Sequence, residues 1–341
     1  MVDAMTNRRA RSVFHALATA LGLLLAVAAP ALAQMPTFDL QGHRGARGLA
    51  PENTLAAFAR ALSIGVTTLE TDLAITKDGV VVLAHDPWLN PDLARGPDGQ
   101  WVQPDGRNRG RRIGTLTLAE LKTYDIGRLN PAGPYAKQWP QQVAADGERY
   151  PTLAELVALT KSAGKPSVRF NLETKIVPDA PDLTPDPAAF ARATVEAVKR
   201  ADIAGRTTIQ SFDWRSLVEV KKLAPELETA CLTIDSGGMN TMRTDVLGAS
   251  PWHAGLKLSD HGGSVPKLVK AAGCGAWSMF WRNLTPELVR EAKGLGLRTL
   301  PWTVNDPAEM RRLIEMGVDG IITDYPDRLR TAMAERGLRL P

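Results

Sequence analysis

Eight short apolar segments alternate with helical patterns along most of this 341-residue chain, which predicts an α/β fold, a TIM (β/α)8 barrel. The length suits one large α/β domain or two smaller ones. No glycine-rich phosphate loop follows any of the segments, which weakens the runner-up, a doubly wound open sheet. We therefore expect a barrel with a small insertion after the second strand and its hairpin.

The expected strands are short runs bounded by turn residues and rich in β-branched residues. Residues 67–75 form a strong example, and the turn Lys77-Asp78-Gly79 leads into residues 80–84 as the second arm of a hairpin. Without that arm, the strands begin near residues 38, 67, 167, 207, 228, 276, 298 and 320.

Helical periodicity follows most of these strands. Asn53 or Thr54 can cap the first helix, which runs to about residue 63, and Gly65 ends it. The other expected helices span residues 153–162, 187–201, 214–223, 265–272, 286–294, 307–316 and 326–336.

Residues 87–150 interrupt this alternation. Gly, Pro, Asn and Trp are frequent there, and the helical period fades except around residues 116–121. A long irregular region inside a domain is usually functional or disordered. We interpret it as an insertion near the mouth of the barrel.

The composition is that of a soluble globular protein, with 44% hydrophobic and 23% charged residues. The formal net charge is only +4, and the sequence contains no long run of Lys or Arg. We therefore expect no nucleic-acid partner. The oligomeric state does not follow from the sequence.

Residues 1–33 have the pattern of a secretory signal peptide. Arg8, Arg9 and Arg11 precede an apolar run at 13–27, and Ala31-Leu32-Ala33 provides small residues for cleavage before Gln34. The alternative is a retained membrane anchor, but the run is shorter than the ~20 residues of a span. We expect an exported protein, periplasmic or secreted, whose mature form is one catalytic domain over 34–341 without a transmembrane anchor.

Cys231 and Cys274 match no metal-binding spacing. They can pair in an oxidising compartment. Because both lie in or beside apolar runs, we favour two buried free thiols.

Charged residues gather where the expected strands end, which is where barrels of this type carry their active sites. Glu70 and Asp72 are two positions apart and so point to one side of their strand, and Glu173 and Lys175 repeat that spacing on the next. Three inward carboxylates need a cation, and Ca²⁺ or Mg²⁺ prefers oxygen ligands. The plainer interpretation is that these acids are strand-end charges paired with Arg44 and Lys175.

His43 and His85 fall in the same layer, and imidazoles exchange protons near neutral pH. Arg44 can bind two phosphate oxygens at once. Together with a metal these groups suit phosphodiester hydrolysis. His253 and His261 lie in a glycine-rich region, and we expect both to be solvated loop histidines.

Several of these motifs, in this order, resemble the glycerophosphodiester phosphodiesterase family. They run from about residue 40 to 330, with residues 87–150 as the least matched part. The motifs are His43-Arg44-Gly45, Pro51-Glu52-Asn53-Thr54, Glu70-Thr71-Asp72, His85-Asp86, Asn171-Leu172-Glu173-Thr174-Lys175, Gln210-Ser211-Phe212, Trp302-Thr303-Val304-Asn305 and residues 320–326.

This resemblance implies a TIM barrel and metal-dependent hydrolysis of a small-molecule glycerophosphodiester to an alcohol and glycerol 3-phosphate. It implies that His43 and His85 are the acid–base pair and that Glu70, Asp72 and Glu173 hold one divalent ion, Ca²⁺ or Mg²⁺. It further implies that Arg44 and Lys175 contact the phosphate and that Trp302 lines the substrate site. Whether the nucleophile is water or the substrate's own glycerol hydroxyl stays open, as does which histidine is the base.

Two other functions are compatible with these motifs. Related barrels cleave lysophospholipids or phosphoinositide-type lipids, which a broad apolar patch on the insertion would favour. The third hypothesis is a non-catalytic protein that binds phosphodiesters, and the presence of both histidines and all three carboxylates argues against it.

Overall fold

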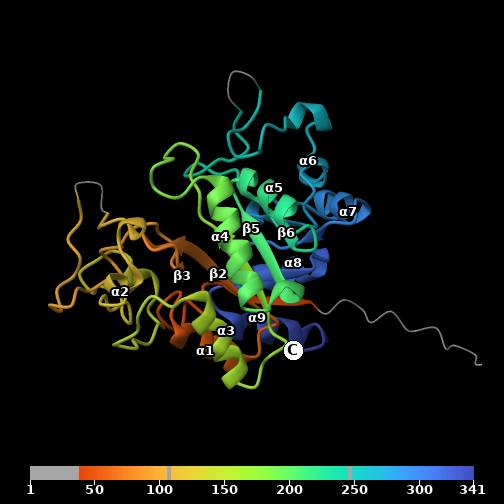
Figure 1. Cartoon of the computed structure of the whole chain (residues 1–341). Coiled ribbons are helices and arrows are strands. Elements are labelled where there is room, and N and C mark those ends of the chain that lie inside the picture. Colours follow the sequence, from red (N-terminus) through yellow and green to blue (C-terminus); the bar gives the residue numbers. More distant parts are fainter. Residues whose placement is uncertain (1–37, 106–108, 245–247) are drawn as a thin grey trace, which may run out of the picture. The chain divides into compact units, whose positions relative to one another are not determined.

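A computed structural model describes residues 38–105, 109–244 and 248–341. Within these residues, eight parallel strands form a nearly closed barrel with helices around it (Figure 1). The strands are β1 (Asp39–Gly42), β2 (Thr68–Ile75), β4 (Arg169–Thr174), β5 (Thr207–Ser211), β6 (Glu228–Thr233), β7 (Ala276–Met279), β8 (Arg298–Thr299) and β9 (Gly320–Thr323). The prediction of an eight-stranded barrel is confirmed.

Backbone hydrogen bonds bring the two ends of the sheet together. β1 pairs with both β2 and β9. On the far side, Ile322 N donates to the Pro301 carbonyl at 3.0 Å and Val304 N to the Ile322 carbonyl at 3.1 Å, just past the short strand β8. All carboxyl ends of the parallel strands therefore face one mouth.

The helices follow their strands as expected, and side-chain caps begin most of them. Thr54 accepts from Ala57 N and so caps the first helix, which Gly65 ends in the left-handed conformation. The helices are α1 (Leu55–Ile64), α2 (Leu118–Leu121), α3 (Leu153–Ser162), α4 (Pro187–Arg200), α5 (Trp214–Leu223), α6 (Val265–Ala271), α7 (Pro286–Gly294), α8 (Pro307–Met316) and α9 (Pro326–Glu335). Among the described helices, none is long and apolar enough to cross a membrane.

The hairpin arm after β2 exists as β3 (Val81–Leu83), which pairs antiparallel with β2. Residues beyond it carry α2 and two 3-10 turns, Ile113–Thr115 and Ala136–Gln138, and gather beside β3 in Figure 1. They have a small hydrophobic core of their own with residues of β2 and β3, including Ala74, Val82, Leu89, Leu116 and Leu121.

The expectation of two free thiols is wrong, because Cys231 and Cys274 form a disulfide. Cys231 lies on β6, and Cys274 lies between the end of α6 and the neighbouring strand β7, which brings the two Cα atoms within 5.9 Å. The apolar surroundings that indicated buried thiols are the layer between the sheet and α6, and that layer holds both cysteines.

Candidate active site

The turn after β1 sets the directions of the first two site residues. Arg44 has a left-handed backbone, with φ of +50°, and Gly45 follows at +85°. A Cβ on Gly42 would lie 2.1 Å from the Gly45 carbonyl oxygen, and one on Gly45 would lie 2.7 Å from the Ala57 backbone. The chain can therefore turn this tightly against α1 only with glycine at both positions.

Glu70, Asp72 and Glu173 form a buried carboxylate cluster at the mouth. One ligand oxygen from each lies within 4.8 Å of the others. The strand register explains this, because Asp72 on β2 pairs with Glu173 on β4 and Glu70 lies two residues before Asp72 on the same face. The sequence prediction that these three side chains meet is correct in geometry.

Their electrostatics favour a cation. Burial and the charges of Asp72 and Glu173 raise the pKa of Glu70 well above the usual carboxyl range. Burial opposes ionisation of Asp72 as well, but Lys175 and Arg44 hold the pKa of Asp72 well below its usual value. Asp72 Oδ1 is buried and has no hydrogen-bond partner among the described atoms. A buried carboxylate oxygen that has an ion-pair contact but no hydrogen bond, inside a cluster of three acids, fits a hard divalent ion.

Two predicted cations flank this cluster. Lys175 Nζ is 2.7 Å from Glu173 Oε1 and 3.4 Å from Asp72 Oδ1. The Arg44 guanidinium lies 3.2 Å from Asp72 Oδ2 and donates to Glu52 at 2.6 Å, while its backbone N–H donates to Glu70. Arg44 is thus held by carboxylates on two sides at the wall of the cavity.

His43 and His85 each place Nδ1 against a carboxylate. For His43 the partner is Asp324 at 2.6 Å, and for His85 it is Asp86 at 3.1 Å. Burial opposes ionisation of Asp86, but hydrogen bonds from His85 and Asn90 lower its pKa to about 2. Burial lowers the pKa of His43 to about 4. A carboxylate at Nδ1 leaves Nε2 of each ring for chemistry, and His43 Nε2 lies 4.0 Å from Glu70 Oε2.

Asp324, after β9, is a site residue that the sequence-based set lacks. It also accepts from Arg47 Nε at 2.8 Å and from the Asn305 amide at 2.6 Å. Burial opposes its ionisation, but Arg47 and His43 hold the pKa of Asp324 well below its usual value. Its position at a strand end was visible in the sequence, but its partner His43 was not.

Residues 87–150 reach this network through two aromatic side chains. The Tyr135 hydroxyl donates to Glu52 and accepts from Arg47 at 3.1 Å. It therefore links Glu52, which binds Arg44, to Arg47, which binds Asp324. The Arg47 guanidinium lies over the Trp139 ring, 4.4 Å from its centroid. The contact of Tyr135 with this network was not expected from the sequence.

The Pro51-Glu52-Asn53-Thr54 turn does more than start a helix. Besides the contact of Glu52 with Arg44, the Asn53 amide donates to Asp72 at 3.1 Å and its oxygen accepts from Thr71. Gln210 on β5 donates to Glu70 at 2.9 Å. These amides orient the carboxylate cluster from two sides.

A cavity of about 430 Å³ opens over these groups. Its lining includes seven of the eight predicted site residues: His43, Arg44, Glu70, His85, Glu173, Lys175 and Trp302. The eighth, Asp72, clusters with the lining residues Glu70 and Glu173. The wall opposite the charged residues is aromatic and aliphatic. Trp302, predicted to contact substrate, belongs to that wall and packs edge-on against Phe212 at 5.4 Å between ring centroids.

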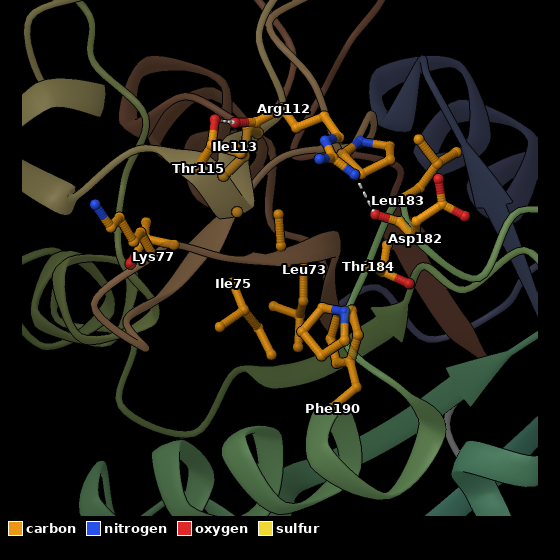
Figure 2. A pocket seen from close by; sticks show the side chains of 15 residues that line it. Leu73, Ile75, Lys77, Arg112, Ile113, Thr115, Asp182, Leu183, Thr184 and Phe190 are labelled. Atoms are coloured by element: carbon orange, nitrogen blue, oxygen red, sulfur yellow. Dashed lines mark hydrogen bonds between the residues drawn. The ribbon is translucent and has the colours of Figure 1, made fainter.

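A second cavity, of about 270 Å³, lies between β2, the 3-10 turn at Ile113–Thr115 and the start of α4 (Figure 2). Its floor is formed by Leu73, Ile75 and Phe190, and Arg112 at its edge donates to the Asp182 carbonyl at 2.6 Å. Its lining includes neither His43 nor His85, nor any of the three clustered carboxylates, so the predicted site residues belong to the larger of these two cavities.

His253 is not the solvated loop residue that we expected. It is buried and stacks on Trp214 with 4.3 Å between ring centroids. Burial lowers its pKa to about 4. His261 lies in the 3-10 turn Leu258–His261 and is partly exposed. Neither histidine lines the larger cavity.

The mouth of this (β/α)8 barrel carries three clustered acids, two carboxylate-bound histidines, an Arg and a Lys. This set of groups is typical of enzymes that act on phosphate esters. Comparison with known proteins specifies the family. The model of the glycerophosphoryl diester phosphodiesterase family matches residues 43–328. This chain belongs to that family, which confirms both the resemblance in the sequence and the expectation of a phosphodiesterase.

Individual relatives agree. A glycerophosphodiester phosphodiesterase from Caldanaerobacter subterraneus subsp. tengcongensis is 32% identical over 86% of this chain and 97% of its own length. One from Bacillus subtilis is 30% identical over 84% of this chain and 83% of its own. A crystal structure from Silicibacter pomeroyi, provisionally named a glycerophosphoryl diester phosphodiesterase, has a TM-score of 0.77 and 35% identity, covering 90% of this chain and 97% of that one.

The fold extends to more distant structures. An Oleispira antarctica phosphodiesterase, solved in complex with its product sn-glycerol-3-phosphate, has a TM-score of 0.61 at 24% identity, covering 87% of this chain and 97% of that one. At that identity the likeness supports the barrel fold.

Proposed function

We propose that this protein hydrolyses glycerophosphodiesters to an alcohol and glycerol 3-phosphate, with His43 and His85 as the acid–base pair and one divalent cation, Ca²⁺ or Mg²⁺. The observation that carries the proposal is the carboxylate cluster, whose ligand atoms lie within 4.8 Å of one another, with His43 Nε2 4.0 Å from its member Glu70. Family membership supplies the substrate class.

In the reaction, an oxygen nucleophile attacks phosphorus and the bond from phosphorus to the alcohol oxygen breaks. One histidine takes the proton of the nucleophile at Nε2, and the other, as the imidazolium, gives its Nε2 proton to the departing alkoxide. Proton exchange with solvent restores both rings before the next turnover. A divalent ion held by Glu70, Asp72 and Glu173 would supply positive charge against the phosphoryl oxygens.

Arg44 and Lys175 bind the phosphate in this proposal. Both cations already face carboxylates, so their side chains are oriented before substrate arrives. Trp302 provides an apolar surface on the opposite wall of the same cavity. Asp324 and Asp86 keep the two imidazoles in the tautomer that presents Nε2.

We also propose that the protein is exported, to the periplasm or beyond, as a single catalytic domain over 34–341 after removal of residues 1–33. The disulfide between Cys231 and Cys274 supports this, because disulfides persist in oxidising compartments. Fractionation of the producing cells tests it: mature protein beginning at Gln34 outside the cytoplasm is expected, and full-length protein in the cytoplasm contradicts it.

Release of glycerol 3-phosphate from glycerophosphocholine, glycerophosphoethanolamine and glycerophosphoinositol, with a lysophospholipid for comparison, tests the activity. His43→Ala and His85→Ala are each expected to abolish release in a protein that still unfolds cooperatively. Chelation is expected to abolish it reversibly. Activity on the lysophospholipid alone, or binding of diesters without turnover by the metal-loaded protein, contradicts the proposal.

A further inference from the structure

The cavity above the carboxylate cluster has two chemically different halves. The half formed by β1, β2, the end of the β3 arm and β4 carries the ionisable residues, including the acids Glu70, Asp86 and Glu173. The half formed beyond β5, β6 and β8 is lined by Phe212, Met239, Trp252 and Trp302 together with aliphatic side chains. Among the described lining residues, the acids therefore all lie on one side.

The apolar half has a defined aromatic geometry. Phe212 stands edge-on to Trp302, with an interplanar angle of 86°, and edge-on to Trp252, with an angle of 74°. All three rings are partly exposed. Rings set nearly perpendicular to one another form adjoining walls of a corner rather than a flat stack.

Polar groups are scarce in this half. Gln210 lines it, but its amide nitrogen donates to Glu70. Asp235, next to the lining residue Ile234, does not line the cavity, and its carboxylate accepts from the Asn240 amide. Thr303 beside Trp302 adds one hydroxyl to the lining. A group with several N–H or O–H donors would lose its water there and gain few acceptors in return.

A bound glycerophosphodiester has its phosphate over the cations and one substituent on each side. The glycerol carries two free hydroxyls, which need polar partners, and the charged half provides them. The alcohol that is released then lies in the aromatic half. This assignment rests on the proposed function.

We propose that the aromatic half selects glycerophosphodiesters whose alcohol carries a quaternary ammonium group, glycerophosphocholine being the simplest. A trimethylammonium group has no N–H donor to satisfy, presents methyl groups to the aliphatic wall and is attracted to aromatic faces. The primary ammonium of an ethanolamine head group and the hydroxyls of inositol have more donors than the few acceptors described in this half can satisfy.

The test compares kcat/KM for three glycerol 3-phosphate diesters in the metal-supplemented protein: the choline ester, the ethanolamine ester and the 3,3-dimethylbutyl ester. The last has the shape of choline without its charge. The choline ester is expected to exceed each of the others about tenfold. Equal values for the choline and dimethylbutyl esters would show that shape alone is recognised and would overturn the proposal.

Phe212→Leu keeps an apolar wall but removes one ring, and is expected to lower the preference for choline over dimethylbutyl about threefold or more. Trp281→Leu is the matched control, because Trp281 lies near the mouth after β7 but does not line the cavity. Its selectivity is expected to equal that of the wild type. An unchanged preference in Phe212→Leu contradicts the proposal.

The two proposals fail differently. If none of the esters releases glycerol 3-phosphate, the proposed hydrolytic function fails. If all are hydrolysed and the ethanolamine ester is equal to or better than the choline ester, hydrolysis stands and the head-group assignment alone is wrong.

Discussion

His43 Nδ1 lies 2.6 Å from Asp324 Oδ1, although 281 positions separate the two residues in the chain. Because Asp324 is ionised it can only accept, so the proton of the neutral imidazole lies on Nδ1 and Nε2 faces the cavity. β1 and β9 are neighbours in the barrel, which is why two strand ends so distant in sequence meet.

Asp324→Asn tests this relationship. The amide keeps the size of the side chain but removes the charge that holds the tautomer, so kcat is expected to fall about 10–100-fold while KM changes little. Asp319→Asn is the control, since Asp319 binds Thr299 and lies outside the cavity lining. It is expected to lower stability and leave kcat unchanged. A KM effect without a kcat effect in Asp324→Asn would contradict the positioning role.

Glu173→Gln tests whether a metal ion binds at the carboxylate cluster. The wild-type protein is expected to gain thermal stability on addition of Ca²⁺ or Mg²⁺, because an ion that binds only the folded state stabilises it. Glu173→Gln is expected to lose most of that gain. Glu228→Gln, at the opposite end of the barrel beside Arg298, is expected to retain it. The same metal-dependent shift in all three proteins would show that the ion binds elsewhere.

His253 predicts a pH dependence of stability. Burial lowers the pKa of His253 to about 4 in the folded protein, from 6.5 for an unperturbed imidazole. Between these values the unfolded chain binds more protons, so stability rises with pH from about 4 to 6.5 and then levels. The contribution of this group above pH 6.5 is on the order of 3 kcal/mol.

His253→Phe retains a ring to stack on Trp214. When the pH falls from 7.5 to 4.5, its free energy of unfolding is expected to decrease by about 2 kcal/mol less than that of the wild type. Urea unfolding at both pH values measures this, and the comparison at pH 7.5 isolates the change in packing. Equal losses in the two proteins would contradict a buried neutral imidazole.

Tyr135→Phe asks whether residues 87–150 contribute to turnover. Removing the hydroxyl takes a hydrogen bond from both Glu52 and Arg47, which hold Arg44 and Asp324, so kcat is expected to fall several-fold to tenfold. Tyr124→Phe is the matched control, since Tyr124 packs on the small core of the same segment. A loss of stability with kcat intact would assign Tyr135 a purely structural role.

Much of the barrel was predictable because its signals are local. Each strand is a short run bounded by turn residues, and most helices have a side-chain cap, so the predicted strand starts and helix bounds agree with the structure within one or two residues. The two-residue spacing of Glu70 and Asp72 placed both on one face, and the structure joins them to Glu173.

What the sequence missed depends on contacts between distant segments. The pairing of His43 with Asp324 requires β1 and β9 to be adjacent. The disulfide requires β6 and β7 to be adjacent, and neither cysteine carries a local signal of its partner. His253 was expected in solvent because its loop is rich in glycine, but the ring of Trp214 covers it.

The disulfide also bears on the aromatic half of the cavity. It closes a segment of 43 positions, and that segment carries Met239 and Trp252. The cross-link restrains both ends of one wall while His43, His85 and the carboxylates lie outside the segment. Reducing agents are therefore expected to erode the choice among head groups before they slow phosphodiester cleavage.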